Sequence, residues 1–192
     1  MGSPAKKGAH KYTYADYQIW PDDERWEIID GDAYAMTPAP SVAHQTILLN
    51  ISGIFREYFK GKACQPFIAP TDVVFDDTNI VQPDVLVVCD KNKITEANIQ
   101  GAPDLVVEIL SPATKLKDRR EKKALYERFG VREYLIIHPE DEMVDRYRLE
   151  HGKYESEDVF GWHETLRLHT FPDMELQLWE VFGKDAPPAE NQ

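Results

Sequence analysis

The sequence predicts a mixed α/β fold built around one β-sheet. Two runs, Val85–Val88 and Leu105–Val107, are apolar at every position, as strands covered on both faces are. Apolar residues at helical spacing stand before and after these runs, over 41–61 and 115–129. Helices and strands therefore alternate in the middle of the chain, and turn signals near both ends add β-hairpins.

Capping and turn residues define the first elements. Thr13 can cap a short helix over 14–20, which Pro21 stops. Asp30-Gly31 is a tight-turn signal, so 25–29 and 32–37 form a hairpin. Ser41 is an N-cap for a helix that ends near 61, and its buried stripe comprises Ile47, Ile51, Ile54, Phe55 and Tyr58.

The remaining elements follow from runs of apolar residues between turn residues. Strand-like pieces at 65–69 and 72–75 are separated by Pro70, and 76–79 is a turn. The central strands are 84–88 and 104–110, with a polar connection that holds a helical turn at 95–99. The second helix, 115–129, is expected to bury Leu116, Ala124, Leu125 and Phe129 and to stop at Gly130. Strands at 131–138, 143–149, 154–159 and 166–171 and a helix at 178–182 complete the list.

Length and composition fit one domain. We expect a disordered lead-in over 1–11, a single domain over 12–183 and a flexible tail over 184–192. No run approaches the roughly 20 apolar residues of a membrane span, and no secretory signal is present, so no membrane partner is expected. Cys64 and Cys89 form no recognisable pattern, which favours a reducing, cytoplasmic location.

The charge is unevenly distributed. A net charge of −12 argues against a sequence-blind polyanion binder. The segment Ala113–Tyr134 nevertheless holds eight basic and four acidic residues, and is therefore +4. Such a basic face is compatible with a phosphate substrate, and equally with a solvated helix whose charges pair along its surface.

Two acidic residues stand in the central strands. Asp84 begins the first strand after a proline, where it is either a turn residue or a ligand. Glu108 lies inside the apolar run 105–110, where burying an unpaired carboxylate costs several kcal/mol. It needs a salt-bridge partner or a bound cation. Two such carboxylates on adjacent strands would repel each other unless a cation such as Mg²⁺ or Mn²⁺ lay between them.

Lys122 follows in the second helix and shares a face with Arg119 and Tyr126. An ammonium group beside such a site can stabilise developing phosphate charge. A helical lysine taken alone more often lies on the surface. The candidate constellation is therefore Asp84, Glu108 and Lys122, each with an ordinary structural explanation beside the functional one.

In this combination the chain resembles the Uma ("Uma-two") family of restriction-endonuclease-like proteins, within the PD-(D/E)XK nuclease superfamily. The resemblance covers roughly Tyr12 to Phe182. The matching segments are Trp26–Gly31, Pro38–Ser41 with His44, Gln82–Asp84, Ala102–Pro112, Asp118 with Lys122 and Tyr126, and Gly130–Tyr134.

The resemblance implies a restriction-endonuclease-like core of order α-β-β-β-α-β. It implies that Asp84 and Glu108 are metal ligands, with the peptide carbonyl of Ile109 as a third. The superfamily pattern has a lysine two residues after the acid, where this chain has Leu110. Lys122 of the following helix then takes the place of that lysine.

Glu27 and His44 are supporting candidates, as ligands, acid/base groups or phosphate contacts. They can equally be a surface acid of the hairpin and a solvated histidine at the helix start. Tyr126 either bonds a carboxylate or packs. Asp104 also follows a proline, but is expected to be a turn residue outside the site.

The resulting hypothesis is a Mg²⁺- or Mn²⁺-dependent endonuclease that hydrolyses DNA phosphodiesters with a metal-activated water. Leu110 and the net charge leave open a non-catalytic DNA-binding or assembly module on the same fold, or hydrolysis of smaller phosphate esters. Four tryptophans outside the core segment, Trp20, Trp26, Trp162 and Trp179, indicate a surface for self-association, so a homodimer is expected.

Overall fold

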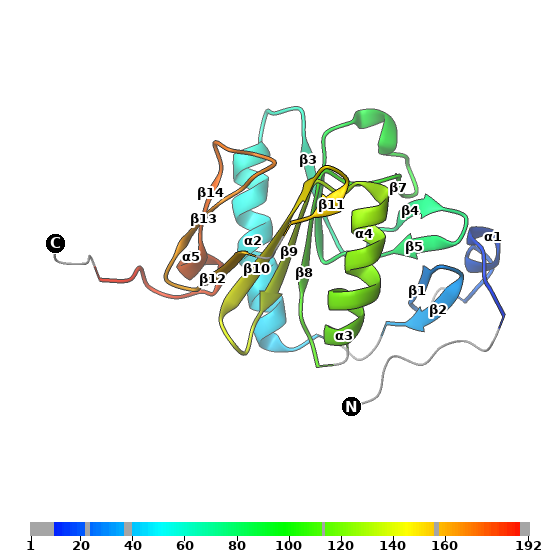
Figure 1. Cartoon of the computed structure of the whole chain (residues 1–192), viewed down its shortest axis with the longest axis horizontal. Coiled ribbons are helices and arrows are strands. Elements are labelled where there is room, and N and C mark those ends of the chain that lie inside the picture. Colours follow the sequence, from blue (N-terminus) through cyan, green and yellow to red (C-terminus); the bar gives the residue numbers. More distant parts are fainter. Residues whose placement is uncertain (1–9, 22–23, 37–39, 113, 156–157, 189–192) are drawn as a thin grey trace.

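Two helices enclose the main sheet of the protein, seen in a computed structural model that describes residues 10–21, 24–36, 40–112, 114–155 and 158–188 (Figure 1). Residues 1–9 of the expected lead-in and residues 189–192 of the expected tail lie outside the described residues. The helices are α1 (Tyr14–Tyr17), α2 (Val42–Phe59), η1 (Lys91–Lys93), α3 (Lys115–Lys117), η2 (Asp118–Lys122), α4 (Lys123–Phe129) and α5 (Leu178–Val181).

The strands are short and numerous. They are β1 (Trp26–Ile29), β2 (Asp32–Ala35), β3 (Gln65–Ile68), β4 (Val73–Asp76), β5 (Asn79–Val81), β6 (Val85–Val88), β7 (Ile99–Gln100), β8 (Leu105–Ile109), β9 (Glu133–His138), β10 (Met143–Glu150), β11 (Lys153–Tyr154), β12 (Asp158–Gly161), β13 (Thr165–Arg167) and β14 (Glu175–Gln177). The predicted core order is confirmed as α2-β3-β6-β8-α3/α4-β9.

The main sheet has the order β11-β10-β9-β8-β6-β3, with β12 also paired to β10. Its central pair, β8 and β9, is parallel, and its other pairs are antiparallel. Helix α2 covers one face through a cluster that includes Ile51 and Phe55. Helix α4 covers the other face through Leu125 and Tyr126 (Figure 1). β6 and β8 are buried throughout, as their unbroken apolar runs predict.

The expectation of one sheet was wrong. The N-terminal hairpin joins β4, β5 and β7 in a separate five-stranded sheet of order β2-β1-β5-β4-β7, and β13 pairs β14 in a third. Proline has no N–H to donate to a ladder, so the chain leaves the main sheet around Pro70 and continues in the second sheet. The helical turn expected at 95–99 lies instead at η1, directly after its capping residue Asp90.

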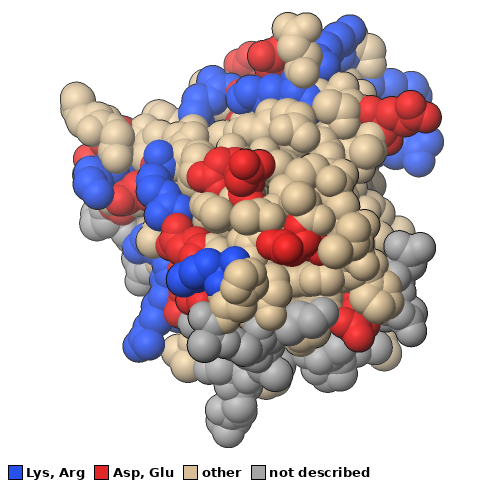
Figure 2. All heavy atoms as spheres, turned by 90° about the vertical axis from the view of Figure 1, so that its right-hand side faces the viewer, with Lys and Arg blue, Asp and Glu red and all other residues tan. Residues whose placement is uncertain are grey.

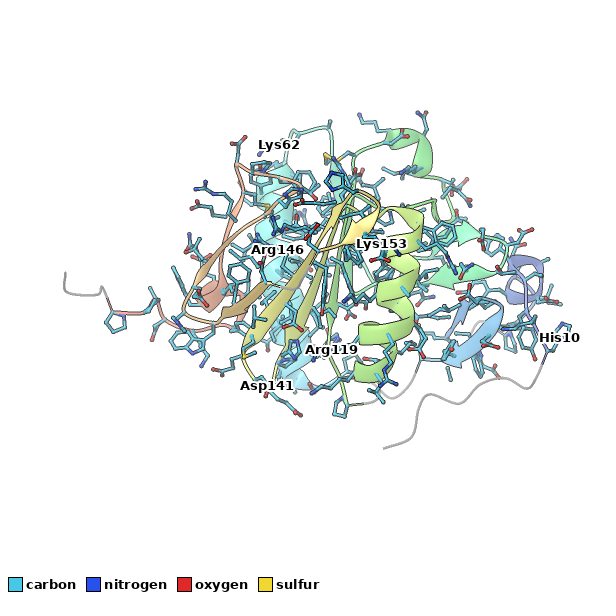
Figure 3. All side chains as sticks on the ribbon, in the orientation of Figure 1. His10, Lys62, Arg119, Asp141, Arg146 and Lys153 are labelled. Atoms are coloured by element: carbon cyan, nitrogen blue, oxygen red, sulfur yellow. A yellow bond between two sulfur atoms is a disulfide. The ribbon has the colours of Figure 1, made fainter. Side chains whose placement is uncertain are left out.

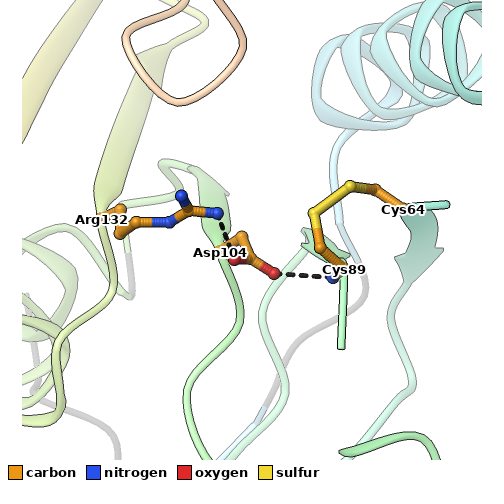
Figure 4. The surroundings of a disulfide bond; sticks show 4 residues. All are labelled: Cys64, Cys89, Asp104 and Arg132. Carbon is orange, nitrogen blue, oxygen red and sulfur yellow. Dashed lines mark hydrogen bonds and ion pairs between the residues drawn. A yellow bond between two sulfur atoms is a disulfide. The ribbon is translucent and has the colours of Figure 1, made fainter. Parts of the chain in front are cut away.

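Cys64 and Cys89 form a disulfide (Figure 4). Although 25 residues separate them, the pairing of Gln65 with Val88 makes them neighbours across β3 and β6. The two cysteines are therefore paired, and they give no support to the reducing location that their lack of pattern favoured. In the part of the chain described, no helix has the length and apolar character to cross a membrane.

Candidate active site

Asp84 stands where the β6–β8 ladder ends. The pairing of Val85 with Val107, continued by one residue, sets Asp84 opposite Glu108. The Oδ2 atom of Asp84 accepts a hydrogen bond from the backbone N–H of Ile109 at 2.7 Å. The same oxygen lies 3.3 Å from Nε2 of His44, in the first turn of α2. His44 is buried rather than solvated, so α2 and β8 together hold this carboxylate in place.

Glu108 is 3 % exposed and has two partners from the following helix. Its Oε1 atom lies 2.7 Å from Nζ of Lys122 and accepts a hydrogen bond from the hydroxyl of Tyr126 at 2.6 Å. Burial, opposed by Lys122 and reinforced by neighbouring carboxylates, raises the pKa of Glu108 to about 8. The structure therefore brings Glu108 and Lys122 into direct contact, with Tyr126 completing the group.

A π-helical segment makes this contact. The sequence predicts a continuous α-helix over 115–129, but η2 has π geometry, with one extra residue in its turn. The extra residue rotates the turn that precedes it, so different side chains of residues 115–118 face the core. Leu116, expected in the core, is 60 % exposed, whereas Lys117 and Asp118 are buried.

Glu27 of β1 is fully buried beneath these lysines. It pairs with Nζ of Lys117 through one oxygen and lies 2.8 Å from Nζ of Lys122 through the other. Its Oε1 atom also accepts the backbone N–H of Gln82 at 3.0 Å. Burial alone would raise the pKa of Glu27, but the two lysines outweigh it and lower the pKa to about 2. Glu27 is therefore an ionised anchor for both lysines, and not a surface acid.

Asp118 completes the cluster. Its Oδ1 atom lies 3.8 Å from Nζ of Lys122, and burial raises its pKa to about 6 against the attraction of the lysines. The ammonium of Lys122 consequently faces three carboxylates, those of Glu27, Glu108 and Asp118. These carboxylates raise the pKa of Lys122 well above its usual value despite its burial, so this lysine is charged.

Acids outnumber bases in this group. Four carboxylates (Asp84, Glu27, Glu108 and Asp118) stand with two ammonium groups (Lys117 and Lys122), which leaves a charge of −2 when all are ionised. Such an excess in a buried site is relieved by taking up protons, as the raised pKa values of Glu108 and Asp118 indicate, or by a cation. Carboxylate oxygens are the ligands that Mg²⁺ and Mn²⁺ prefer, so the donor set fits either ion.

A different group of side chains among the described residues has ligand atoms close enough together to hold a metal ion. Glu150, His151 and Glu155 bring one ligand atom each to within 4.8 Å of one another, around the turn between β10 and β11. Among the residues that the structure describes, Asp84 and Glu108 form no such group of three with another acidic, histidine or cysteine side chain.

Sequence reasoning found Asp84, Glu108, Lys122, Glu27 and His44, and all five lie in this region of the structure. It missed Lys117 and assigned no role to Asp118. Under α-helical spacing, a residue five positions before Lys122 points away from it, so only the π geometry could have shown Lys117. Asp104 is outside the group as expected, since it accepts the Cys89 N–H and pairs with Arg132 (Figure 4).

Comparison with known proteins places this chain in a family. The model of the Uma2 family, described as "Putative restriction endonuclease", matches residues 14–178. A Synechocystis sp. (strain PCC 6803) protein, "Uncharacterized protein slr1290", is 31% identical over 143 residues, which cover 71% of this chain and 74% of that protein.

The fold has a solved counterpart. A crystal structure from Anabaena variabilis, described as "a putative nuclease belonging to DUF820", superposes with a TM-score of 0.75 at 19% identity, over 89% of this chain and 97% of that one. The restriction-endonuclease-like fold predicted from the sequence is thereby confirmed. The chain belongs to the Uma2 family, within the PD-(D/E)XK nuclease superfamily.

Proposed function

We propose that this protein is a Mg²⁺- or Mn²⁺-dependent endonuclease that hydrolyses DNA phosphodiesters. The observation that carries the proposal is the contact between Glu108 and Lys122. Leu110, where the superfamily pattern has its lysine, packs in the core, and Lys122 brings an ammonium group to the same carboxylate from the helix. In this proposal the ammonium of Lys122 replaces the lysine that the superfamily pattern has at position 110.

In this proposal Asp84 and Glu108 hold the cation, with the carbonyl of Ile109 as a third ligand. A bound divalent ion supplies an activated water and neutralises charge on the phosphate. His44 and the Ile109 N–H keep the Asp84 carboxylate oriented. Glu27 keeps Lys122 protonated and aimed at Glu108, so that the ammonium can stabilise charge that develops on the phosphate.

The chain offers a matched pair of variants for the test. Pro83-Asp84 and Pro103-Asp104 are the same dipeptide before neighbouring strands, but the Asp104 side chain bonds Cys89 and Arg132. We expect Asp84→Asn to lose at least about 100-fold in DNA cleavage with Mg²⁺ or Mn²⁺, and Asp104→Asn to retain it. Wild-type protein that cleaves no duplex, single-stranded or branched DNA, or an Asp84→Asn variant that cleaves equally well, would refute the proposal.

The burial of the site favours one alternative, a non-catalytic DNA-binding or assembly module. Glu108 and Lys122 are almost wholly enclosed and satisfy each other, as in a structural ion pair. Asp84, whose side chain is 19% exposed, is the route by which an ion would enter. Calorimetric titration with Mn²⁺ separates the two functions: the alternative requires that DNA binds while Mn²⁺ does not.

The proposal includes a homodimer, as expected for an enzyme that cuts both strands of a duplex, and a cytoplasmic location. Light scattering at several protein concentrations measures the first, and a mass that corresponds to one chain throughout would contradict it.

A further inference from the structure

A basic cleft lies at the opposite end of α2 from His44. It has a volume of about 810 Å³ and is bounded by the last turns of α2, the connection to β3 and the start of η1. Four cationic side chains line it, and one acid: Arg56, Lys60, Lys62, Lys91 and Glu57. A net charge of +3 in one cleft stands out in a chain whose net charge is −12.

The cations of the cleft are placed to meet an external anion. Lys60 and Glu57 are 77% and 80% exposed and 3.9 Å apart, so this ion pair is weak in water. Nζ of Lys62 lies 3.1 Å from the centre of the Tyr58 ring, which fixes its position without neutralising its charge. Asp90, next to Lys91, accepts hydrogen bonds from the backbone N–H and the side-chain amide of Asn92.

The two walls of the cleft are tied together. Lys62 precedes Cys64 by two residues and Lys91 follows Cys89 by two, so the disulfide links the segment that carries one cation to the segment that carries the other (Figure 4). The disulfide therefore holds the backbone of the two walls together. Lys62 marks the place of the cleft at the upper end of α2 in Figure 3.

The helix between the cleft and the candidate active site is uncharged on its exposed side. From Val42 to Phe55, α2 has no acidic or basic residue other than His44. Its exposed positions include Val42 and Leu49, at 83% and 74%. Figure 2 shows a different face, where acidic side chains stand near the centre and Lys and Arg lie along the upper edge and the left side. Along α2 itself, the first carboxylate after Val42 is that of Glu57.

We propose that this cleft binds the phosphate backbone of duplex DNA at a distance from the cleavage site, an inference that rests on the proposed function. From His44 to Lys60 is 16 residues of helix, or about 24 Å. Along β6 the distance from Asp84 to Cys89 is about 17 Å. At about 3.4 Å per base pair, the cleft contacts DNA about five to seven base pairs from the phosphate at Asp84.

The test is the salt dependence of DNA binding in EDTA, where no cleavage occurs. Each phosphate contact contributes about −0.9 to the slope of log K against log salt concentration. A triple variant, Lys60→Gln, Lys62→Gln and Lys91→Gln, should make this slope shallower by about 2.7. A fourfold rise in salt concentration should then weaken DNA binding by the variant about 40-fold less than DNA binding by the wild type. A control with the same change in net charge is Arg128→Gln, Lys153→Gln and Arg167→Gln, whose cations pair elsewhere on the surface.

The control variant should keep the wild-type slope, and both variants should keep the wild-type melting temperature. Equal slopes for wild type and the cleft variant, or equal losses in both variants, would overturn the inference. It would also be overturned if the cleft variant abolished self-association and left DNA binding unchanged, because the occupant would then be a second copy of this acidic chain. Failure of cleavage with Mg²⁺ while the cleft slope persists would overturn the proposed function alone.

Discussion

Replacing Lys122 by methionine tests the arrangement of the buried cluster most directly. Methionine keeps the length and apolar stem of the side chain and removes the ammonium that faces Glu27, Glu108 and Asp118. Removing one partner of a buried ion pair costs about 3–5 kcal/mol, because the remaining charge is left uncompensated. A domain of this size is stable by about 5–15 kcal/mol, so Lys122→Met should consume a large part of that stability.

Combining Lys122→Met with Glu108→Gln shows whether the unpaired Glu108 carboxyl causes the loss of stability. Glu108→Gln alone should change the free energy of unfolding by only about 1 kcal/mol, because the amide oxygen can still accept the Tyr126 hydroxyl. At about pH 9, above the pKa of Glu108, adding it to Lys122→Met should restore about 1–3 kcal/mol, since a buried carboxyl that Lys122 no longer compensates disappears. Urea unfolding of the wild type, the two single variants and the double variant measures all four terms. A loss below about 1 kcal/mol for Lys122→Met, or strictly additive effects, would refute the reasoning.

The same geometry makes three further predictions. Because the pKa of Glu108 is raised, the stability that this residue contributes is present below about pH 4.5 and is lost as the pH rises through about 8. Because the pKa of Glu27 is lowered, the stability that it contributes is present above about pH 4.5 and is lost as the pH falls toward about 2. Melting curves across this range should show both trends, and Glu108→Gln should flatten the loss at high pH. Mn²⁺ binding near pH 7 should release protons from Glu108, detected as a buffer-dependent heat, and Asp84→Asn should weaken that binding at least about tenfold; a heat that is equal in all buffers would contradict the release. Gly130→Ala should cost about 1–2 kcal/mol because φ there is 84°, whereas Gly53→Ala inside α2, also with open space at Cβ, should stabilise by about 0.5–1 kcal/mol; equal effects in thermal melts would contradict the backbone argument.

Local signals in the sequence predicted local structure well. Thr13 forms the full capping box of α1, and Ser41 caps α2 through the His44 N–H. Asp30 and Gly31 both have positive φ, at 50° and 75°, as a tight hairpin turn requires. In each case the residue acts on neighbours within a few positions, so its effect is readable without knowing the fold.

Features that depend on distant pairing were not predictable in this way. The disulfide needs the register of β3 against β6, and the separate sheet needs the contact of Ile28 with Ile80. A partner for Glu108 was predictable because a buried carboxylate demands one, whereas the sequence left open whether Tyr126, which supplies a hydroxyl to it, bonds a carboxylate or packs. The contact of Lys117 with Glu27 was not predictable, since the amino-acid composition of a π-helical turn does not distinguish it from an α-helical turn.

The π turn has a consequence for insertions and deletions in this helix. Deleting one residue between 118 and 122 would return the segment to α-helical spacing and rotate everything before it by about 100°. Lys117 would swing away from Glu27, while Lys122 and Tyr126 would keep their places over Glu108. A change of a single residue in chain length can therefore separate the two lysines, leaving one in contact with the acids and turning the other toward solvent.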